Sequence, residues 1–138
     1  MKTDVDDLIR AARAARGFAY APYSQFLVGA AVLTQNGRVF AGCNVENASY
    51  GLSNCAERTA LFSAVAAGFG LGYLTHLAIV ADTEVPVAPC GACRQVMLEL
   101  GGGNLVVVQA NLRGVVAQTT AAALLPGAFF LPASNGKP

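Results

Sequence analysis

Charged side chains are scarce in this chain. Asp, Glu, Lys and Arg make up 12% of its 138 residues, against roughly 25% in a typical soluble domain. The formal net charge is +1, and the basic residues are dispersed arginines with a lysine near each end. No basic surface that would bind the phosphates of a nucleic acid is therefore expected. With 54% hydrophobic residues, the composition also predicts that apolar surface is buried between copies of the chain.

Long apolar runs are missing as well. The longest are interrupted by Gly or Pro and fall short of the ~18 residues that a membrane-spanning helix needs. The acidic start, MKTDVDD, is not followed by the apolar segment of a secretory signal peptide. We therefore expect no membrane partner, a cytoplasmic location, and one domain over residues 1–138. In that compartment the four cysteines indicate a metal or catalysis more than disulfides.

The spacing of apolar residues and of glycines predicts an α/β fold. Asn36-Gly37 is a strong hairpin signal between two strands, and the third strand is apolar enough to be buried on both faces. The order α-β-β-α-β-α-β-β favours a mixed five-stranded sheet with helices on both faces, a three-layer α/β/α arrangement. Helices are expected at residues 3–17 (with Thr3 as N-cap), 55–68, 90–101 and 120–125, and strands at 26–34, 38–43, 74–81, 105–110 and 115–119.

A thiol, a carboxylate and a guanidinium occur together in Cys55-Ala56-Glu57-Arg58. Apolar residues downstream recur at helical spacing, so Cys55 lies at or near a helix start. Positions two apart on a helix do not share a side face. If Cys55 and Glu57 serve one site, that site must lie off the N-terminal end of the helix, where the helix dipole favours a thiolate.

A second helix start carries two more thiols, in Pro89-Cys90-Gly91-Ala92-Cys93-Arg94-Gln95. The C-x-x-C spacing lets two thiols bind one metal ion, and Cys55 can supply a third ligand. Three protein ligands leave one tetrahedral position open to water, which distinguishes a catalytic zinc site from a closed structural one. Glu57 is then not needed as a ligand and is placed to move protons.

Two arginines follow the thiols closely. Arg58 lies three residues after Cys55 on the same helix face, and Arg94 follows Cys93. Three thiolates leave the zinc unit formally at minus one, which weakens its effect on a bound water. We expect one or both arginines to donate hydrogen bonds to the thiolates and draw charge away.

The two cysteine motifs together closely resemble those of the small, homotetrameric, zinc-dependent cytidine deaminases. An all-cysteine ligand set is typical of the tetrameric type, whereas many zinc deaminases have a histidine first. The resemblance covers nearly the whole chain and includes both cysteine motifs, Ala21-Pro22-Tyr23-Ser24, Val28-Gly29-Ala30-Ala31, Gly42-Cys43-Asn44-Val45-Glu46-Asn47-Ala48 and Leu124-Leu125-Pro126-Gly127-Ala128-Phe129.

The resemblance implies a role for each matching position. It implies one Zn²⁺ per chain, a nucleoside substrate, a homotetramer with shared sites, and hydrolytic deamination of cytidine and deoxycytidine in pyrimidine salvage. The implied roles are zinc ligands for Cys55, Cys90 and Cys93, the proton shuttle for Glu57, ribose contacts for Asn44 and Glu46, base contacts for Phe26 and the Ala56 backbone, and completion of a neighbouring subunit's site for Tyr50 and Phe129.

Other interpretations of these residues remain open. Cys90 and Cys93 could be a redox pair, and Cys43 could be a fourth ligand, although a buried inert thiol is commoner. His76, the only histidine, is expected in the core or an interface. A cytosine-containing antibiotic such as blasticidin S is an alternative substrate. A zinc-stabilised interaction module is the non-enzymatic alternative, and it predicts four protein ligands on the metal.

Overall fold

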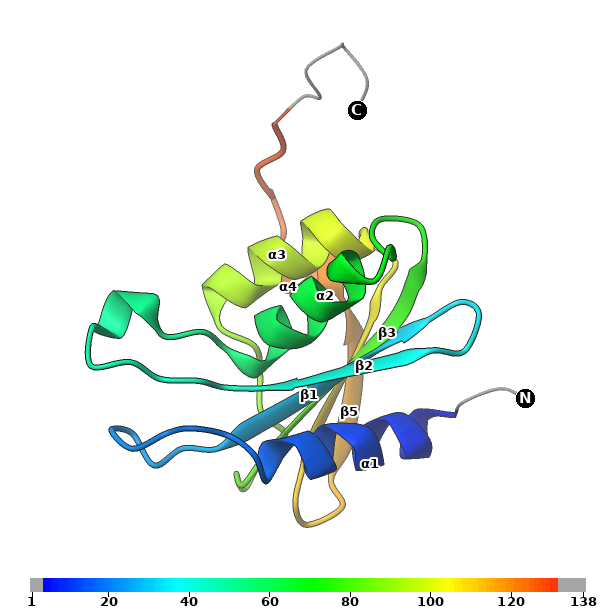
Figure 1. Ribbon diagram of the computed structural model, residues 1–138. Coiled ribbons are helices and arrows are strands. Elements are labelled where there is room, and N and C mark those ends of the chain that lie inside the picture. Colours follow the sequence, from blue (N-terminus) through cyan, green and yellow to red (C-terminus); the bar gives the residue numbers. More distant parts are fainter. Residues whose placement is uncertain (1–3, 132–138) are drawn as a thin grey trace.

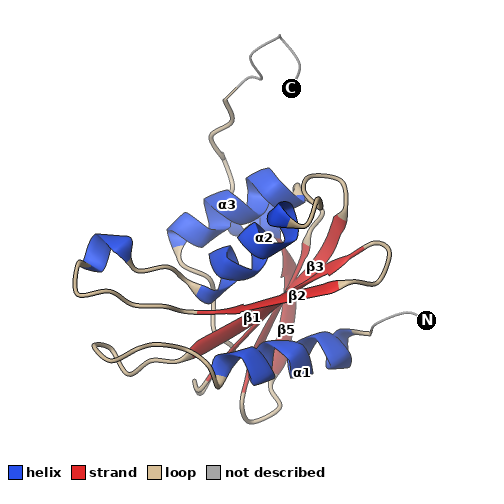
Figure 2. Ribbon diagram, viewed as in Figure 1, coloured by secondary structure: helices blue, strands red, loops and turns tan. Residues whose placement is uncertain are grey.

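The computed structural model describes residues 4–131, which form one mixed sheet between two layers of helices (Figures 1 and 2). The strand order is β2-β1-β3-β4-β5. Strands β3 and β4 are parallel and the other neighbours are antiparallel. The elements are α1 (Val5–Arg16), β1 (Val28–Thr34), β2 (Val39–Cys43), the 3₁₀ turn η1 (Tyr50–Leu52), α2 (Ala56–Ala66), β3 (Leu74–Ala81), α3 (Gly91–Gly101), β4 (Val106–Asn111), β5 (Val116–Thr120) and α4 (Ala121–Leu124).

Helix α1 covers one face of the sheet, and α2, α3 and α4 cover the other (Figure 1). On the α1 face, Leu8 packs with Leu33 and Val80. On the other face, Leu61 and Met97 pack in one cluster with alternate residues of the same strands. Because β1 and β3 have apolar side chains on both faces, they form the centre of the sheet. The predicted α/β/α arrangement is confirmed.

Most predicted element boundaries lie within two residues of those observed, and the start of the chain shows one error. The N-cap of α1 is Asp4, whose carboxylate accepts a hydrogen bond from the Asp7 N–H at 2.8 Å. Thr3, the predicted cap, lies outside the described residues. Strand β1 starts two residues later than predicted because the Phe26 and Leu27 carbonyls accept from the side chains of Asn44 and Arg16 instead of a strand.

A glycine lets β2 approach the start of α2. A Cβ atom on Gly42 would lie 2.6 Å from the Ala60 nitrogen and 2.8 Å from the Thr59 Cβ, so any larger residue would push the strand away. This contact fixes the first turn of α2 on the sheet. Within residues 4–131, no helix is long and apolar enough to cross a membrane.

Candidate functional site

Three cysteine sulfurs meet where α2 and α3 begin. Cys55 is the N-cap of α2, Cys90 is the N-cap of α3, and Cys93 lies in the first turn of α3. The three Sγ atoms lie within 4.8 Å of one another, and those of Cys55 and Cys90 are 3.8 Å apart. Among the described residues, Cys43 does not belong to this cluster. Three convergent thiols at two helix N-termini fit zinc, which prefers sulfur ligands and tetrahedral geometry.

The thiols are electrostatically coupled. Hydrogen bonds from the Cys93 thiol, the Arg58 guanidinium and Cys90 lower the pKa of Cys55 to about 5, against the opposing effect of burial. The pairing with Cys55 and burial raise the pKa of Cys93. The pairing therefore favours the thiolate form of Cys55 over that of Cys93. A metal ligand must be deprotonated, so the lowered pKa of Cys55 favours the form that binds a metal.

The two arginines make different contacts. Arg58 Nη2 donates to Cys55 Sγ at 3.3 Å, and this hydrogen bond raises the pKa of the guanidinium, which stays charged. Its Nε is buried without a hydrogen-bond partner in the described chain. Arg94 instead donates from Nε to the Pro89 carbonyl at 2.8 Å and from Nη1 to the Leu124 carbonyl at 3.2 Å. Only Arg58 therefore makes the contact expected of a thiolate partner.

Glu57 lies in the first turn of α2, and only 5% of its surface is exposed. Burial raises the pKa of its carboxyl, and the negative charge of Cys55 acts in the same direction. A raised pKa brings a carboxyl group closer to the operating pH, which is the direction that general acid–base catalysis favours. The same helix start thus supplies both a sulfur and a buried carboxyl group.

The side chains of Asn44 and Glu46 are bound to the loop before β1. Asn44 accepts from the Val28 N–H at 2.9 Å and donates to the Phe26 carbonyl at 2.7 Å. Glu46 accepts from the N–H groups of Tyr23 and Ser24 at 3.0 and 3.1 Å, and from the Ser24 hydroxyl. These bonds, the Ser24 hydroxyl foremost, lower the pKa of Glu46. The carboxylate is held ionised beside a hollow of about 360 Å³ lined by Tyr23, Ser24, Glu46, Tyr50 and Ser53.

The aromatic residues expected to contact the substrate are exposed. Tyr50 lies beside Glu46 and packs edge-on against Tyr23, with ring centroids 5.9 Å apart. Phe129 lies on the segment after α4, which runs away from the helix layer in Figure 1, and its carbonyl accepts from Gln95 Nε2 at 3.1 Å. Neither Phe26 nor Phe129 lines the hollow around Glu46. Within the described chain these aromatics are not gathered into one pocket.

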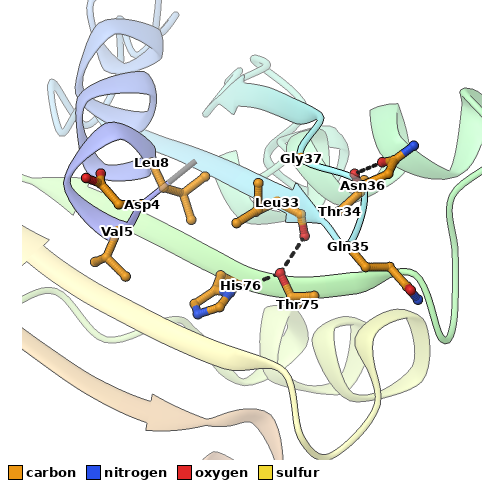
Figure 3. A pocket seen from close by; sticks show the side chains of 10 residues that line it. All are labelled: Asp4, Val5, Leu8, Leu33, Thr34, Gln35, Asn36, Gly37, Thr75 and His76. Atoms are coloured by element: carbon orange, nitrogen blue, oxygen red, sulfur yellow. Dashed lines mark hydrogen bonds between the residues drawn. The ribbon is translucent and has the colours of Figure 1, made fainter. Parts of the chain in front are cut away.

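A larger cavity lies elsewhere and contains none of the predicted site residues (Figure 3). It has a volume of about 800 Å³ and lies between the start of α1, the β1–β2 hairpin and β3. His76 lines it, with Nδ1 at 2.9 Å from the Thr75 hydroxyl. His76 is half-buried and does not belong to the sulfur cluster.

Two residues beside the cluster, Asn54 and Thr59, were not predicted from the sequence. Asn54 donates to the Thr59 hydroxyl at 3.1 Å, and this hydroxyl donates to the Cys55 carbonyl at 3.0 Å. The available signal was their position, one residue before Cys55 and four residues after it. Thr and Asn are common at helix starts, so their type alone does not mark them.

Known proteins resemble this chain over most of its length. Residues 2–109 match the family model described as the cytidine and deoxycytidylate deaminase zinc-binding region. A cytidine deaminase from Sporosarcina psychrophila is 53% identical over 126 residues, which are 91% of each chain. One from Halalkalibacterium halodurans is 55% identical over 88% of this chain and 91% of its own. The crystal structure of cytidine deaminase from Burkholderia pseudomallei has a TM-score of 0.90 and 61% identity, and the match covers 92% of this chain and all of that one.

Proposed function

The chain belongs to the cytidine and deoxycytidylate deaminase family, and we propose that it converts cytidine and deoxycytidine plus water to uridine and deoxyuridine plus ammonia. One observation carries this proposal most directly: three thiols converge where α2 and α3 begin, beside the buried carboxyl group of Glu57. A structural zinc module would need a fourth protein ligand. In the described chain the cluster contains three cysteines and no further His, Cys, Asp or Glu.

Cys55, Cys90 and Cys93 would hold one Zn²⁺ per chain. Zinc, when bound, supplies a Lewis acid that lowers the pKa of water toward neutrality. Arg58 supports this chemistry because its hydrogen bond to Cys55 withdraws negative charge from the ligand set. Arg94 was expected to share this role, and its bonds to two backbone carbonyls favour holding the start of α3 in place instead.

Glu57 would carry the protons of the reaction. It takes a proton from the attacking water and passes it to ring N3, so that the oxygen bonds to C4 of the pyrimidine. Glu57 then takes the proton of the new C4 hydroxyl and gives it to the amino group at C4, so that the C4=O double bond forms, the C–N bond breaks, and ammonia leaves. Burial suits Glu57 to this role because it keeps the pKa of the carboxyl above its usual range.

The nucleoside would lie between the sulfur cluster and residues 44–46. Asn44 and Glu46 would bind the ribose hydroxyls. Glu46 Oε2 has capacity for one, because among the described residues it accepts only from the Ser24 hydroxyl and a carboxylate oxygen can accept two hydrogen bonds. The Ala56 N–H lies at the start of α2, where helix N–H groups lack intrahelical partners, and would contact the pyrimidine edge. Phe26 would line the base pocket, and Tyr50 and Phe129 would complete the site of a neighbouring subunit.

Self-association as a homotetramer is part of this proposal. The exposed Tyr50 and Phe129 and the low charge content support it. A role in pyrimidine salvage also belongs to the proposal. So does a cytoplasmic location, because thiols stay reduced in that compartment.

The test is the loss of ultraviolet absorbance when zinc-assayed protein meets cytidine, with Glu57→Gln measured beside it. We expect rapid loss for the wild type only, with one zinc per chain in both proteins. No loss from fully loaded wild type would contradict the proposal, and the same assay with a cytosine nucleoside antibiotic would then examine the alternative substrate.

A further inference from the structure

A short chain of side-chain hydrogen bonds starts beside the sulfur cluster. The Asn54 amide donates to the Thr59 hydroxyl at 3.1 Å, and the hydroxyl donates to the Cys55 carbonyl at 3.0 Å. The same carbonyl also accepts the Thr59 N–H at 3.1 Å, the first hydrogen bond of α2. Two donors from one residue therefore hold the peptide group of Cys55.

The bond from the Thr59 hydroxyl matters because the Cys55 side chain makes no capping bond to the helix. An ordinary N-cap side chain bonds to an N–H of the first turn and so fixes its own orientation. The Cys55 sulfur is directed to Cys90 and Arg58 instead. Its direction therefore depends on how firmly the backbone of residue 55 is held, which is what the Thr59 hydroxyl supplies.

The Thr59 side chain has little room to move. Gly42 of β2 lies so close that a Cβ atom on it would be 2.8 Å from the Thr59 Cβ. A β-branched side chain in a helix also has few rotamers available. The hydroxyl is thus held between its donor and its acceptor.

Asn54 connects this chain of bonds to the other half of the site. Its backbone makes both hydrogen bonds of a bridge with Val45, at 3.0 Å and 2.9 Å. Val45 lies between Asn44 and Glu46, the two residues proposed to bind the ribose. Asn54 therefore holds the Asn44-Val45-Glu46 segment through its backbone. Through its amide it holds the Thr59 hydroxyl, and so the Cys55 peptide group.

We propose that Asn54 and Thr59 are positioning residues that hold the Cys55 sulfur at a fixed distance from the Asn44-Val45-Glu46 segment. This inference rests on the proposed zinc site and substrate. Neither residue touches the substrate or the metal in this account. Both act through Cys55, and Asn54 acts also through Val45.

A simpler explanation is that Thr59 only stabilises a helix, because Ser and Thr often bond to the carbonyl four residues back. Helix α2 contains a matched control for this explanation. Ser63 Oγ donates to the Thr59 carbonyl at 2.9 Å, the same bond one turn further from the cluster. Removing either hydroxyl has the same local effect on the helix, and only removal of the Thr59 hydroxyl would disturb the cluster.

The experiment compares Thr59→Val, Thr59→Ser and Ser63→Ala in the zinc-loaded full chain. The rate at which a chelator removes zinc, and kcat and KM for cytidine, are measured with the unfolding temperature. We expect Thr59→Val to lose zinc about 10- to 100-fold faster and to lose a similar factor in kcat, as other supporting groups of metal ligands do. Thr59→Ser should recover most of both losses, and Ser63→Ala should lose zinc at the wild-type rate.

Asn54→Ala tests the bond from the Asn54 amide to the Thr59 hydroxyl, because the substitution keeps the backbone bridge to Val45. We expect zinc loss faster than in the wild type and slower than in Thr59→Val, with the KM for cytidine close to the wild-type value. The proposal is wrong if Thr59→Val retains zinc as wild type does, or if Ser63→Ala loses zinc equally fast. If Thr59→Val does not fold, Thr59→Ala takes its place. The rates of zinc release from Thr59→Ser and Asn54→Ala are then compared with the rate from Ser63→Ala, and the same outcomes decide.

The chelator measurement separates this inference from the proposed function. A wild-type protein that binds zinc without deaminating cytidine would contradict the function and leave the zinc-release comparison intact. A fully active Thr59→Val protein with normal zinc release would contradict the inference alone.

Discussion

The sulfur cluster and the exposed aromatic residues differ in how far a single chain completes them. Cys93 is buried, Glu57 is 5% exposed, and Cys55 and Arg58 are hydrogen-bonded to each other. By contrast, Phe26, Tyr50 and Phe129 have 42%, 75% and 68% of their surface exposed. These groups assigned to the chemistry thus have partners within the chain, and the aromatic residues assigned to substrate contact have much of their surface free.

This difference fits the proposed homotetramer, in which neighbouring chains would complete each other's sites. Buried ionisable groups need partners at fixed distances, and the starts of two helices on one sheet provide them. Exposed aromatic rings favour contact with another surface. A second copy of the chain would cover this surface and would bring Tyr50 and Phe129 to a site in the neighbour. The substitutions below separate the two regions: some should change the sulfur cluster and Glu57, and others the exposed aromatic residues.

The largest effect is expected from Glu57→Gln. The amide has the same size and cannot carry a proton, so kcat should fall by about 10²- to 10⁴-fold. Zinc content and the unfolding temperature should stay close to those of the wild type, because Glu57 is not in the sulfur cluster. Metal analysis beside steady-state kinetics checks this, and substantial remaining turnover would remove Glu57 from the mechanism.

Arg58→Ala should weaken the sulfur cluster itself. Loss of the hydrogen bond to Cys55 should lower zinc affinity and kcat by about 10- to 100-fold. Arg94→Ala is the matched control, since Arg94 bonds to two carbonyls and to no sulfur. It should lower the unfolding temperature and change zinc affinity less than Arg58→Ala. Equal zinc loss in both variants would show that charge near the cluster matters more than the hydrogen bond.

Phe129→Ala should weaken substrate contact and leave the sulfur cluster unchanged. Loss of one aromatic contact, about 1 kcal/mol, should raise KM roughly fivefold, with zinc content unchanged. Phe130→Ala removes the neighbouring exposed ring and serves as the control. If the neighbour's site is completed by Phe129, an inactive Glu57→Gln chain should still lower the KM of a Phe129→Ala chain when the two are co-assembled. No change in KM on mixing would contradict a shared site.

The smallest effect concerns the pH dependence of the loop held by Glu46. Its pKa is lowered in the folded chain, so its bonds to Tyr23 and Ser24 are present above the pKa of an unfolded glutamate, about 4.3. They are lost as the pH falls through the lower folded value. Protection of the Ser24 amide from hydrogen exchange should therefore be constant near neutral pH and decrease only in acid. Glu46→Gln should show lower protection without this acid transition.

Local signals in the sequence predicted much of this molecule. A run of apolar residues predicted β3 with its observed ends, and Gly68, with φ of +98°, follows the end of α2 as expected. The placement of Cys55 and Cys90 at helix starts is confirmed by their N-cap positions. These features depend on neighbours in the sequence, which is why they can be read from it.

Contacts between distant segments could not be predicted in the same way. Arg94 donates to Leu124, 30 residues away, because α4 happens to end beside α3. Glu46 bonds to Ser24, 22 residues earlier, because β1 and β2 bring the two loops together. The roles assigned to the site residues remain predictions, since side-chain pairing depends on packing that no local pattern encodes.

The closeness of the sulfurs has a consequence for handling the protein. Cys90 is exposed, and its Sγ lies 3.8 Å from that of Cys55. When a chelator removes zinc in air, a thiolate beside an accessible thiol is oxidised readily to a disulfide, and a disulfide cannot bind the metal. The bound ion would thus protect its own ligands, and demetallation would be reversible only in the presence of a reductant.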